Sequence, residues 1–276
     1  MSNTTIMLEQ LRELKLAGIL EGLHEQRTSS RYAELPFEDR LALLIDREVM
    51  RRNNQRLQRR LKNATIRQSS ASLDAVKVSS ERGLSKQQLL ELGTCQWIRS
   101  RLSLIVSGPT GAGKSFLASA LADQACRLSL TVSYARASDL IAELLLSKND
   151  GSFRTLRKRL SKVDLLVVDD FLRDPLSAPH SREFLDLIDD RYRSGSCLFV
   201  SQLAVADWHR HIADPTIADA ILDRIVHDSL RVELSGIDSM RKLTSPLQAD
   251  PKIHVASLRG HNRNFKEMDN SLDTET

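Results

Sequence analysis

Eight consecutive residues have the types and spacing needed to bind the phosphates of a nucleotide. They read Gly-Pro-Thr-Gly-Ala-Gly-Lys-Ser and comprise Gly108, Pro109, Thr110, Gly111, Ala112, Gly113, Lys114 and Ser115. In such a glycine-rich loop the backbone N–H groups converge on phosphate oxygens, helped by the positive end of the following helix. Lys114 is expected to reach the β- and γ-phosphates, and the Ser115 hydroxyl to ligate Mg²⁺. We therefore predict a nucleotide site, with Phe116 at its edge.

The residues on either side of this loop indicate the strand and the helix that must hold it. The apolar run 102–107 is typical of a buried strand, and residues 116–128 place Leu117, Leu121 and Leu128 on one side of a helix. A strand, a glycine loop and a helix in this order are the context that the phosphate-binding pattern requires. The alternative is a glycine-rich turn without a ligand, and the two flanking elements argue against it.

Two adjacent carboxylates end another strongly apolar run of the chain. Residues 163–170 read Val-Asp-Leu-Leu-Val-Val-Asp-Asp, which is typical of a central parallel strand buried on both faces. Ligands bind at the carboxyl ends of such strands, so Asp169 and Asp170 should lie near the phosphate loop. We predict that Asp169 holds the hydration shell of Mg²⁺. Asp170 is expected to polarise the water that attacks the γ-phosphate.

A polar residue follows the next predicted strand, residues 197–201, at the same edge of the sheet. Gln202 carries two donor hydrogens and one carbonyl acceptor, which suit it to orient the attacking water. Ser201 is the second choice for this role. A simple loop-capping role for Gln202 is the alternative.

Two predicted helices carry clusters of basic side chains. Between residues 47 and 62 there are seven basic residues and a single acid, and a second cluster lies within residues 148–159. A merely soluble helix does not need charge of one sign, so we predict contacts with the phosphate backbone of DNA. Solvated helix faces are the alternative. The candidate contacts are Arg51, Arg52, Arg56, Arg59, Arg60, Arg154, Arg157 and Lys158.

Length and periodicity suggest four parts in the 276-residue chain. Residues 1–67 should form a small helical domain, because leucines recur there at helical spacing. We expect this domain to contact DNA or other protomers. Residues 68–95 begin with a polar, small-residue stretch typical of a linker and continue into a helix. Residues 96–245 form the nucleotide-binding domain, and 246–276 are a polar tail that we expect to be disordered.

Composition limits the class of protein. Hydrophobic residues make up 41% of the chain and charged residues 28%, with a net charge of +4, as in ordinary globular proteins. Three scattered cysteines fit neither a metal site nor a disulfide framework, so reduced thiols are expected. No apolar run approaches the 18 residues that a membrane helix needs. We expect a cytoplasmic protein that does not bind membranes.

The order of these motifs resembles the AAA+ ATPases, and most closely the IstB family of helper proteins for insertion-sequence transposition. A more distant likeness is to the DnaC helicase loaders. The stretch 214–226, Asp-Pro-Thr-Ile-Ala-Asp-Ala-Ile-Leu-Asp-Arg-Ile-Val, is far more specific than a phosphate loop. The other stretches that carry the likeness are 108–115, 165–171, 188–192, 201–203, 207–208 and 239–242.

This resemblance implies a five-stranded parallel sheet flanked by helices, behind a small helical domain and without the usual helical lid. It implies a self-assembling ATPase that uses ATP and Mg²⁺ at sites between protomers, binds duplex DNA with little sequence preference and cooperates with a transposase. Lys114 and Ser115 match the Walker A pair and Asp169 the Walker B acid. Asp170 stands where many members have Glu, so hydrolysis should be slow and ATP is expected to act as a switch.

Three further positions carry expected roles by resemblance. Gln202 stands where many AAA+ proteins have the first sensor residue, and Arg224 stands at the arginine that reaches a neighbour's γ-phosphate. Local pairing with an acid is the alternative for Arg224. Arg241 is the candidate for a second sensor.

Three other functions remain open from the sequence. A helicase loader of the same fold would use its N-terminal helices to hold a helicase. A small-molecule kinase would use the same phosphate loop but would need a pocket for its acceptor substrate. A nucleotide-gated binding protein would need no useful turnover.

Overall fold

The computed structural model describes residues 3–235, and these contain one parallel five-stranded sheet. The strand order is β2-β3-β4-β1-β5, so β4 separates the two strands that carry the predicted phosphate loop and the acid pair. Because all strands run in one direction, their carboxyl ends meet at one edge. The strands are β1 (Ser103–Ser107), β2 (Val132–Arg136), β3 (Leu165–Asp169), β4 (Ser196–Ser201) and β5 (Ser229–Glu233).

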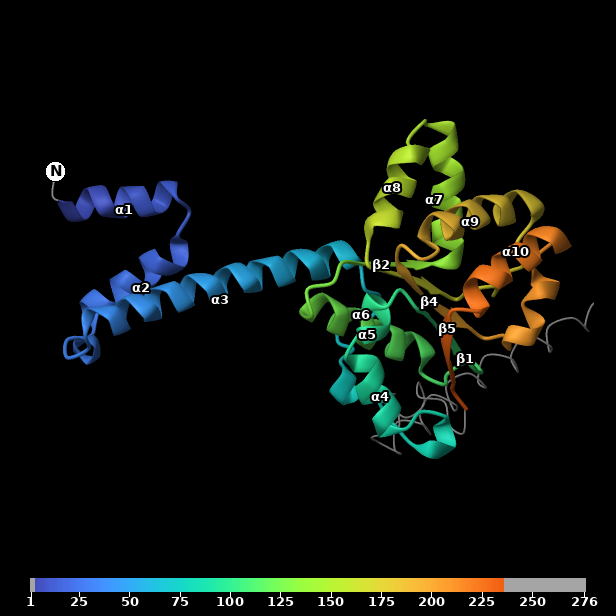
Figure 1. Ribbon diagram of the computed structural model, residues 1–276, viewed down its shortest axis with the longest axis horizontal. Helices are drawn as coiled ribbons and strands as arrows, with labels where there is room; N and C mark the ends of the chain where they lie inside the picture. Colours follow the sequence, from blue (N-terminus) through green and yellow to red (C-terminus); the bar gives the residue numbers. More distant parts are fainter. Residues whose placement is uncertain (1–2, 236–276) are drawn as a thin grey trace, which may run out of the picture.

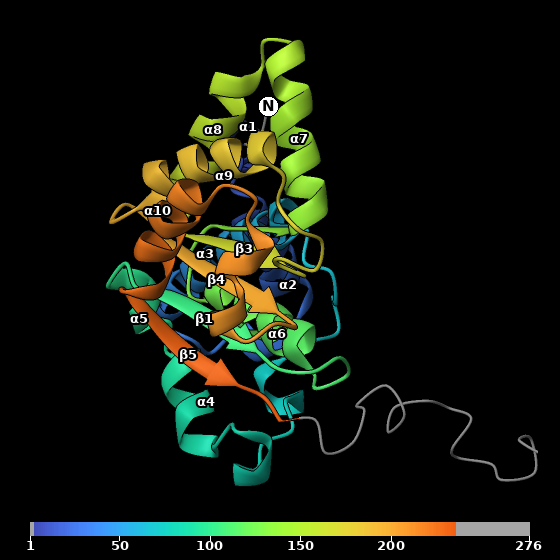
Figure 2. The same cartoon turned by 90° about the vertical axis from the view of Figure 1, so that its right-hand side faces the viewer.

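Helices cover both faces of the sheet, as Figure 2 shows. One face packs against α4 (Lys86–Gly93), α5 (Gln96–Arg99) and α6 (Lys114–Arg127). The other face packs against α7 (Ala137–Asn149), α8 (Phe153–Lys162), α9 (Ala178–Arg191) and α10 (Pro215–Val226).

The apolar runs of the sequence explain this three-layer packing. Side chains alternate between the faces of a strand, so Leu165 and Val167 enter one core while Leu166 and Val168 enter the other. Every residue of β3 is buried, which confirms the predicted central strand. The fold class predicted from the sequence is therefore confirmed, with the sheet flanked by helices and preceded by a helical region.

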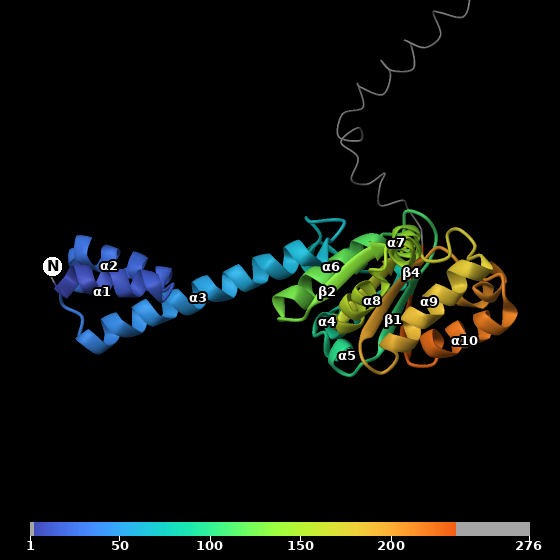
Figure 3. The same cartoon turned by 90° about the horizontal axis from the view of Figure 1, so that it is seen from above.

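The N-terminal helices form an arm that projects from the sheet body (Figures 1 and 3). This N-terminal arm consists of α1 (Asn3–Glu13), α2 (Ala17–Thr28) and α3 (Phe37–Ala64). The 28 residues of α3 span about 42 Å at 1.5 Å per residue. Two separate helices, α1 and α2, occupy residues 3–28.

Glycines bring α2 and α3 close together at the far end of the arm. A Cβ at Gly18 would lie 2.8 Å from the Glu48 Cα, so the backbone of α3 leaves room there only for glycine. The backbone N–H of Gly18 donates to the buried carboxylate of Glu48 at 2.7 Å. This contact and the Arg52 guanidinium hold the pKa of Glu48 below its usual value, although burial alone would raise it.

The predicted domain limits at residues 67, 95 and 245 remain predictions. Residues 246–276 and the position of Arg241 lie outside the described residues, as does the segment after β5 where a helical lid would follow. The segment from Thr65 to Leu84 lies against the sheet body, with Ala71 and Leu84 buried in it.

Gly83 is a position where this packing requires glycine. Its φ is +74°, and an added Cβ would lie 2.0 Å from the Glu233 carbonyl oxygen. We expect Gly83→Ala to lower the free energy of unfolding by more than about 2 kcal/mol, measured by denaturant titration. Gly151 is the matched control, because its φ is +77° with nothing within 4 Å of an added Cβ. Equal losses in Gly83→Ala and Gly151→Ala would contradict the role of this contact.

Candidate functional site

The phosphate loop connects β1 to α6 at the carboxyl edge of the sheet. Gly108, Gly111 and Gly113 all have positive φ, at 138°, 87° and 88°. A Cβ at Gly108 would lie 2.1 Å from the Leu234 carbonyl oxygen, so the approach of the chain after β5 also requires glycine there. The loop therefore has the geometry in which consecutive backbone N–H groups can surround an anion.

Lys114 is the first residue of α6 and folds back over the loop. Its Nζ donates to the carbonyl oxygens of Gly108 at 2.7 Å and Pro109 at 2.9 Å. The residue is 7% exposed, so its ammonium group is held inside the loop. Such a positive charge at a helix N-terminus favours binding of phosphate oxygens.

Ser115 and Asp169 meet, although they come from different elements. The Ser115 hydroxyl donates to Oδ1 of Asp169 at 3.0 Å, and the Tyr134 hydroxyl donates to Oδ2 at 2.7 Å. Burial, and to a smaller extent the neighbouring Asp169 carboxylate, raises the pKa of Tyr134. The phenol therefore keeps its proton and stays a donor. Hydroxyl and carboxylate oxygens are ligands that suit Mg²⁺, which usually takes one or two protein ligands and adds phosphate oxygens. These residues therefore fit a magnesium ion that arrives with a nucleotide.

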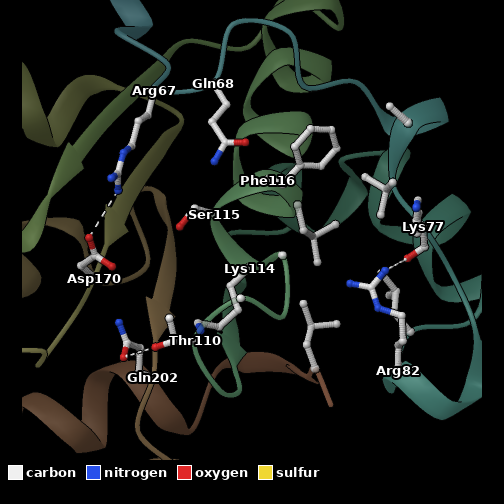
Figure 4. Close-up of a pocket in the computed structure, with 17 residues that line it drawn as sticks. Arg67, Gln68, Lys77, Arg82, Thr110, Lys114, Ser115, Phe116, Asp170 and Gln202 are labelled. Carbon is white, nitrogen blue, oxygen red and sulfur yellow. Dashed lines mark hydrogen bonds and ion pairs between the residues drawn. The ribbon is translucent and has the colours of Figure 1, made fainter. Parts of the chain in front are cut away.

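Asp170 follows β3 in the left-handed conformation, with φ at +57°. Its backbone N–H donates to Oδ1 of Asp169 at 2.9 Å, and this turn directs the two carboxylates differently. The Asp169 side chain is fully buried, whereas that of Asp170 is 21% exposed and lines the cavity (Figure 4). Asp170 is thus the acid that a water molecule can reach.

Gln202 comes directly after β4 and is hydrogen-bonded to the phosphate loop. Its Oε1 accepts a hydrogen bond from the Thr110 hydroxyl at 2.7 Å, as Figure 4 shows. Ser201 is buried, and its hydroxyl donates to the Phe171 carbonyl at 2.8 Å and accepts from the Leu203 N–H. The structure therefore places Gln202 at the cavity and uses Ser201 to hold the turn.

These residues surround a cavity of about 390 Å³. This volume lies within the range of small-molecule sites. One wall consists of the phosphate loop with Asp170 and Gln202, and the opposite wall comes from residues 67–84. Apolar side chains also line the cavity, which suits the flat, weakly polar face of a nucleobase. These side chains are Val76, Leu84, Phe116, Leu117 and Leu234.

Two arginines of this wall were not among the predicted site residues. The Arg82 guanidinium donates to the carbonyl oxygens of Ala112 at 2.6 Å and Lys77 at 2.8 Å, which connects the wall to the phosphate loop. The Arg67 guanidinium lies 3.4 Å from Oδ2 of Asp169 and 3.3 Å from Oδ2 of Asp170. The polar, small-residue composition of residues 63–80 resembles a linker and carries no signal of this role.

Arg224 lies apart from the cavity that this chain forms. It belongs to α10, where it forms an ion pair with Asp189 of α9 and donates to the Ala220 carbonyl at 2.8 Å. Its side chain is 30% exposed, so part of the guanidinium faces solvent. Arg224 does not line the nucleotide cavity of its own chain.

The predicted DNA contacts divide into paired and unpaired side chains. Arg51 pairs with Glu21, Arg52 with Glu48 at 2.7 Å, and Arg157 with Asp190 at 2.6 Å. The remaining candidates have no ion pair within residues 3–235, and all but the half-buried Arg60 are exposed. They are Arg56, Arg59, Arg60, Arg154 and Lys158.

Other kinds of site are not seen in the part of the chain that the structure describes. Between residues 3 and 235 no three His, Cys, Asp or Glu side chains gather as a metal-binding group. The three cysteines are unpaired and buried, and burial raises the pKa of both Cys95 and Cys126 to about 11. Over the same range, no helix combines the length and apolar character needed to cross a bilayer.

Comparison with known proteins agrees with this geometry. Residues 9–248 match the family profile of the IstB-like ATP binding proteins. The chain belongs to this family. Its relatives include an insertion sequence ATP-binding protein, y4pL, of Sinorhizobium fredii, which is 37% identical over 85% of this chain and 95% of that protein. An ATP-binding protein of insertion sequence IS1162 from Pseudomonas fluorescens is 38% identical over 71% of this chain and 85% of its own length.

Solved structures confirm the AAA+ fold of this IstB-like protein. AMPPCP-bound DnaA from Aquifex aeolicus superposes with a TM-score of 0.50 at 18% identity, over 72% of this chain and 58% of DnaA. DnaI superposes with a TM-score of 0.50 at 18% identity, over 62% of this chain and 91% of DnaI. The match to the family profile confirms the resemblance to the IstB family inferred from the motifs. The solved structures, at 18% identity, support the fold alone.

Proposed function

We propose that this protein is an ATP-dependent, self-assembling DNA-binding ATPase that assists a transposase in selecting or preparing target DNA. One observation carries the proposal. A buried Asp169 joined to Ser115 and a water-accessible Asp170 lie together beside a glycine loop whose lysine points inward. The names of the relatives, which associate them with insertion sequences and ATP, supply the biological setting.

Each residue has a proposed part in hydrolysis. The loop N–H groups and Lys114 bind the β- and γ-phosphates, and Ser115 and Asp169 hold Mg²⁺. The ion, when bound, neutralises charge on the phosphate oxygens. Asp170 accepts a proton from the attacking water, and Gln202 orients that water through its amide. Aspartate is one methylene shorter than glutamate, which favours slow hydrolysis and the use of ATP as a switch.

The proposed DNA contact relies on many weak phosphate contacts. Single exposed charges contribute little, but several protomers that align α3 and α8 along one duplex would combine their contacts. An arginine presented by a neighbour, here Arg224, would make that alignment depend on ATP. The exposed Arg56, Arg59, Arg154 and Lys158 support this arrangement.

Binding of labelled duplex DNA tests the proposal. We expect tight binding with ATP, weak binding with ADP or without nucleotide, and a steep decrease in affinity as salt is raised. The double variant Arg56→Ala/Arg59→Ala should reduce the slope of log affinity against log salt by roughly 2. Arg210→Ala is the control, because Arg210 is paired with Asp207 outside both basic clusters. Failure to bind DNA in every nucleotide state would refute DNA binding by this protein.

A helicase loader is a second candidate. Apolar side chains of α3 are exposed, including Leu41, Ile45 and Val49, and this surface is suited to a protein client. Capture assays with the purified full-length protein, tested with a transposase and a replicative helicase in turn, separate the two functions. Stimulation of ATP hydrolysis by DNA separates both from a small-molecule kinase.

A further inference from the structure

Arg67 occupies an unusual position between the N-terminal arm and the nucleotide cavity. It follows the last residue of α3, Ala64, by three positions, and its side chain points into the cavity toward Asp170 (Figure 4). Its Nη1 is shared between Oδ2 of Asp169, at 3.4 Å, and Oδ2 of Asp170, at 3.3 Å. One guanidinium nitrogen thus contacts both carboxylates that the proposed function assigns to the metal ion and the attacking water.

The end of α3 is also joined to the acid-bearing strand by a second path. Thr65 adopts the left-handed conformation, and its hydroxyl hydrogen is shared between the carbonyl oxygens of Ala64, at 2.8 Å, and of Tyr134 on β2, at 3.0 Å. The Tyr134 hydroxyl in turn donates to Asp169. The base of α3 therefore contacts Asp169 directly through Arg67 and indirectly through Thr65 and Tyr134.

The contact between Arg67 and the two acids is long and partly exposed to solvent. Two neighbouring carboxylates repel each other, and the guanidinium relieves this repulsion. Both distances exceed the 2.7–2.9 Å of a tight charge-assisted hydrogen bond, and the Arg67 side chain is 36% exposed. A divalent cation held by Ser115 and Oδ1 of Asp169 would lie next to these oxygens and would repel the guanidinium. The triphosphate beside it would then be the nearest anion for Arg67.

We propose that Arg67 is a latch that couples occupancy of the nucleotide site to the N-terminal arm, an inference that rests on the proposed binding of MgATP. Arg67 pairs with Asp169 and Asp170 and holds the base of α3 against the sheet. Binding of Mg²⁺ at Asp169 together with ATP would release Arg67 toward the phosphates and free the base of the arm to move.

The first test uses Mg²⁺ alone as the probe, because the latch predicts competition that is independent of turnover. Without nucleotide, Arg67→Ala should melt at a lower temperature than the wild type, since the two acids lose their counter-charge. Mg²⁺ should restore the melting temperature of Arg67→Ala at a severalfold lower concentration than it affects the wild type. Arg67→Lys should lie between them. Lys62→Ala, an exposed basic residue in the last turn of α3, should behave as the wild type.

The second test follows the arm by hydrogen exchange at residues 57–68. In the wild type, MgATP should accelerate exchange there, whereas Arg67→Ala should exchange fast already without nucleotide. If Arg67→Ala matches the wild type in both its Mg²⁺ response and its exchange, the latch is refuted. If instead the wild type fails to bind MgATP at all, the proposed function itself fails. The two failures are therefore distinguished by one titration of the wild type with a fluorescent ATP analogue.

Discussion

Replacing Lys114 with alanine is expected to abolish nucleotide binding at micromolar concentrations. The ammonium group is buried inside the phosphate loop and is the charge that the triphosphate would meet there. Charge-assisted hydrogen bonds contribute about 1.5–3 kcal/mol each, and Lys114 should contact two phosphates, so affinity should decrease by at least about 100-fold. Equilibrium titration with a fluorescent ATP analogue measures this loss.

A second lysine provides a matched control for this experiment. Lys86 is also the first residue of a helix, α4, but it is exposed and does not line the cavity. Lys86→Ala should bind the analogue as the wild type does, and both variants should keep the wild-type circular dichroism spectrum. Unchanged affinity in Lys114→Ala would show that the glycine loop is not the nucleotide site.

Arg224→Ala is expected to keep nucleotide affinity while hydrolysis decreases by about 10³-fold or more. An arginine supplied to a neighbouring active site stabilises charge on the transferred phosphoryl group and typically contributes this factor. Arg224 lies outside the cavity of its own chain, so its loss should leave binding by the monomer intact. Phosphate release assays with and without duplex DNA measure the effect.

Two comparisons separate a role in trans from a structural one. Asp189→Ala removes the acid that pairs with Arg224 but keeps the guanidinium, so hydrolysis should persist. Mixing Arg224→Ala with Lys114→Ala should restore part of the activity, because one supplies a competent site and the other an intact arginine. Normal turnover by Arg224→Ala alone would remove Arg224 from the reaction.

Features that depend on neighbouring residues could be predicted from the sequence. The glycine spacing around Lys114, the apolar run ending at Asp169 and the cap at Asp214 each specify an element through local chemistry. The Asp214 carboxylate, for example, accepts from the N–H groups of Thr216 and Ile217 at the start of α10. The continuous apolar run ending at Asp169 predicted a strand buried on both faces, and therefore a sheet with helices on both sides.

Contacts between distant residues could not be predicted in this way. Arg67 lies 102 positions before Asp169, and its surroundings are the small polar residues that usually form a linker. The hydrogen bond between Thr110 and Gln202 likewise joins residues 92 positions apart. Nothing in either local pattern specifies the partner, because the partner is set by the strand order that brings the segments together.

Because α3 is long, a small change in its tilt moves its far end by several ångströms. A tilt of about 10° at the base of a 28-residue helix carries its far end through about 7 Å. Successive base pairs are about 3.4 Å apart along a duplex, so this displacement equals roughly twice the rise per base pair. If Arg67 couples the acids to α3 as proposed, a change of counter-ion at Asp169 and Asp170 would move the far end of the arm by a distance comparable to the spacing of base pairs.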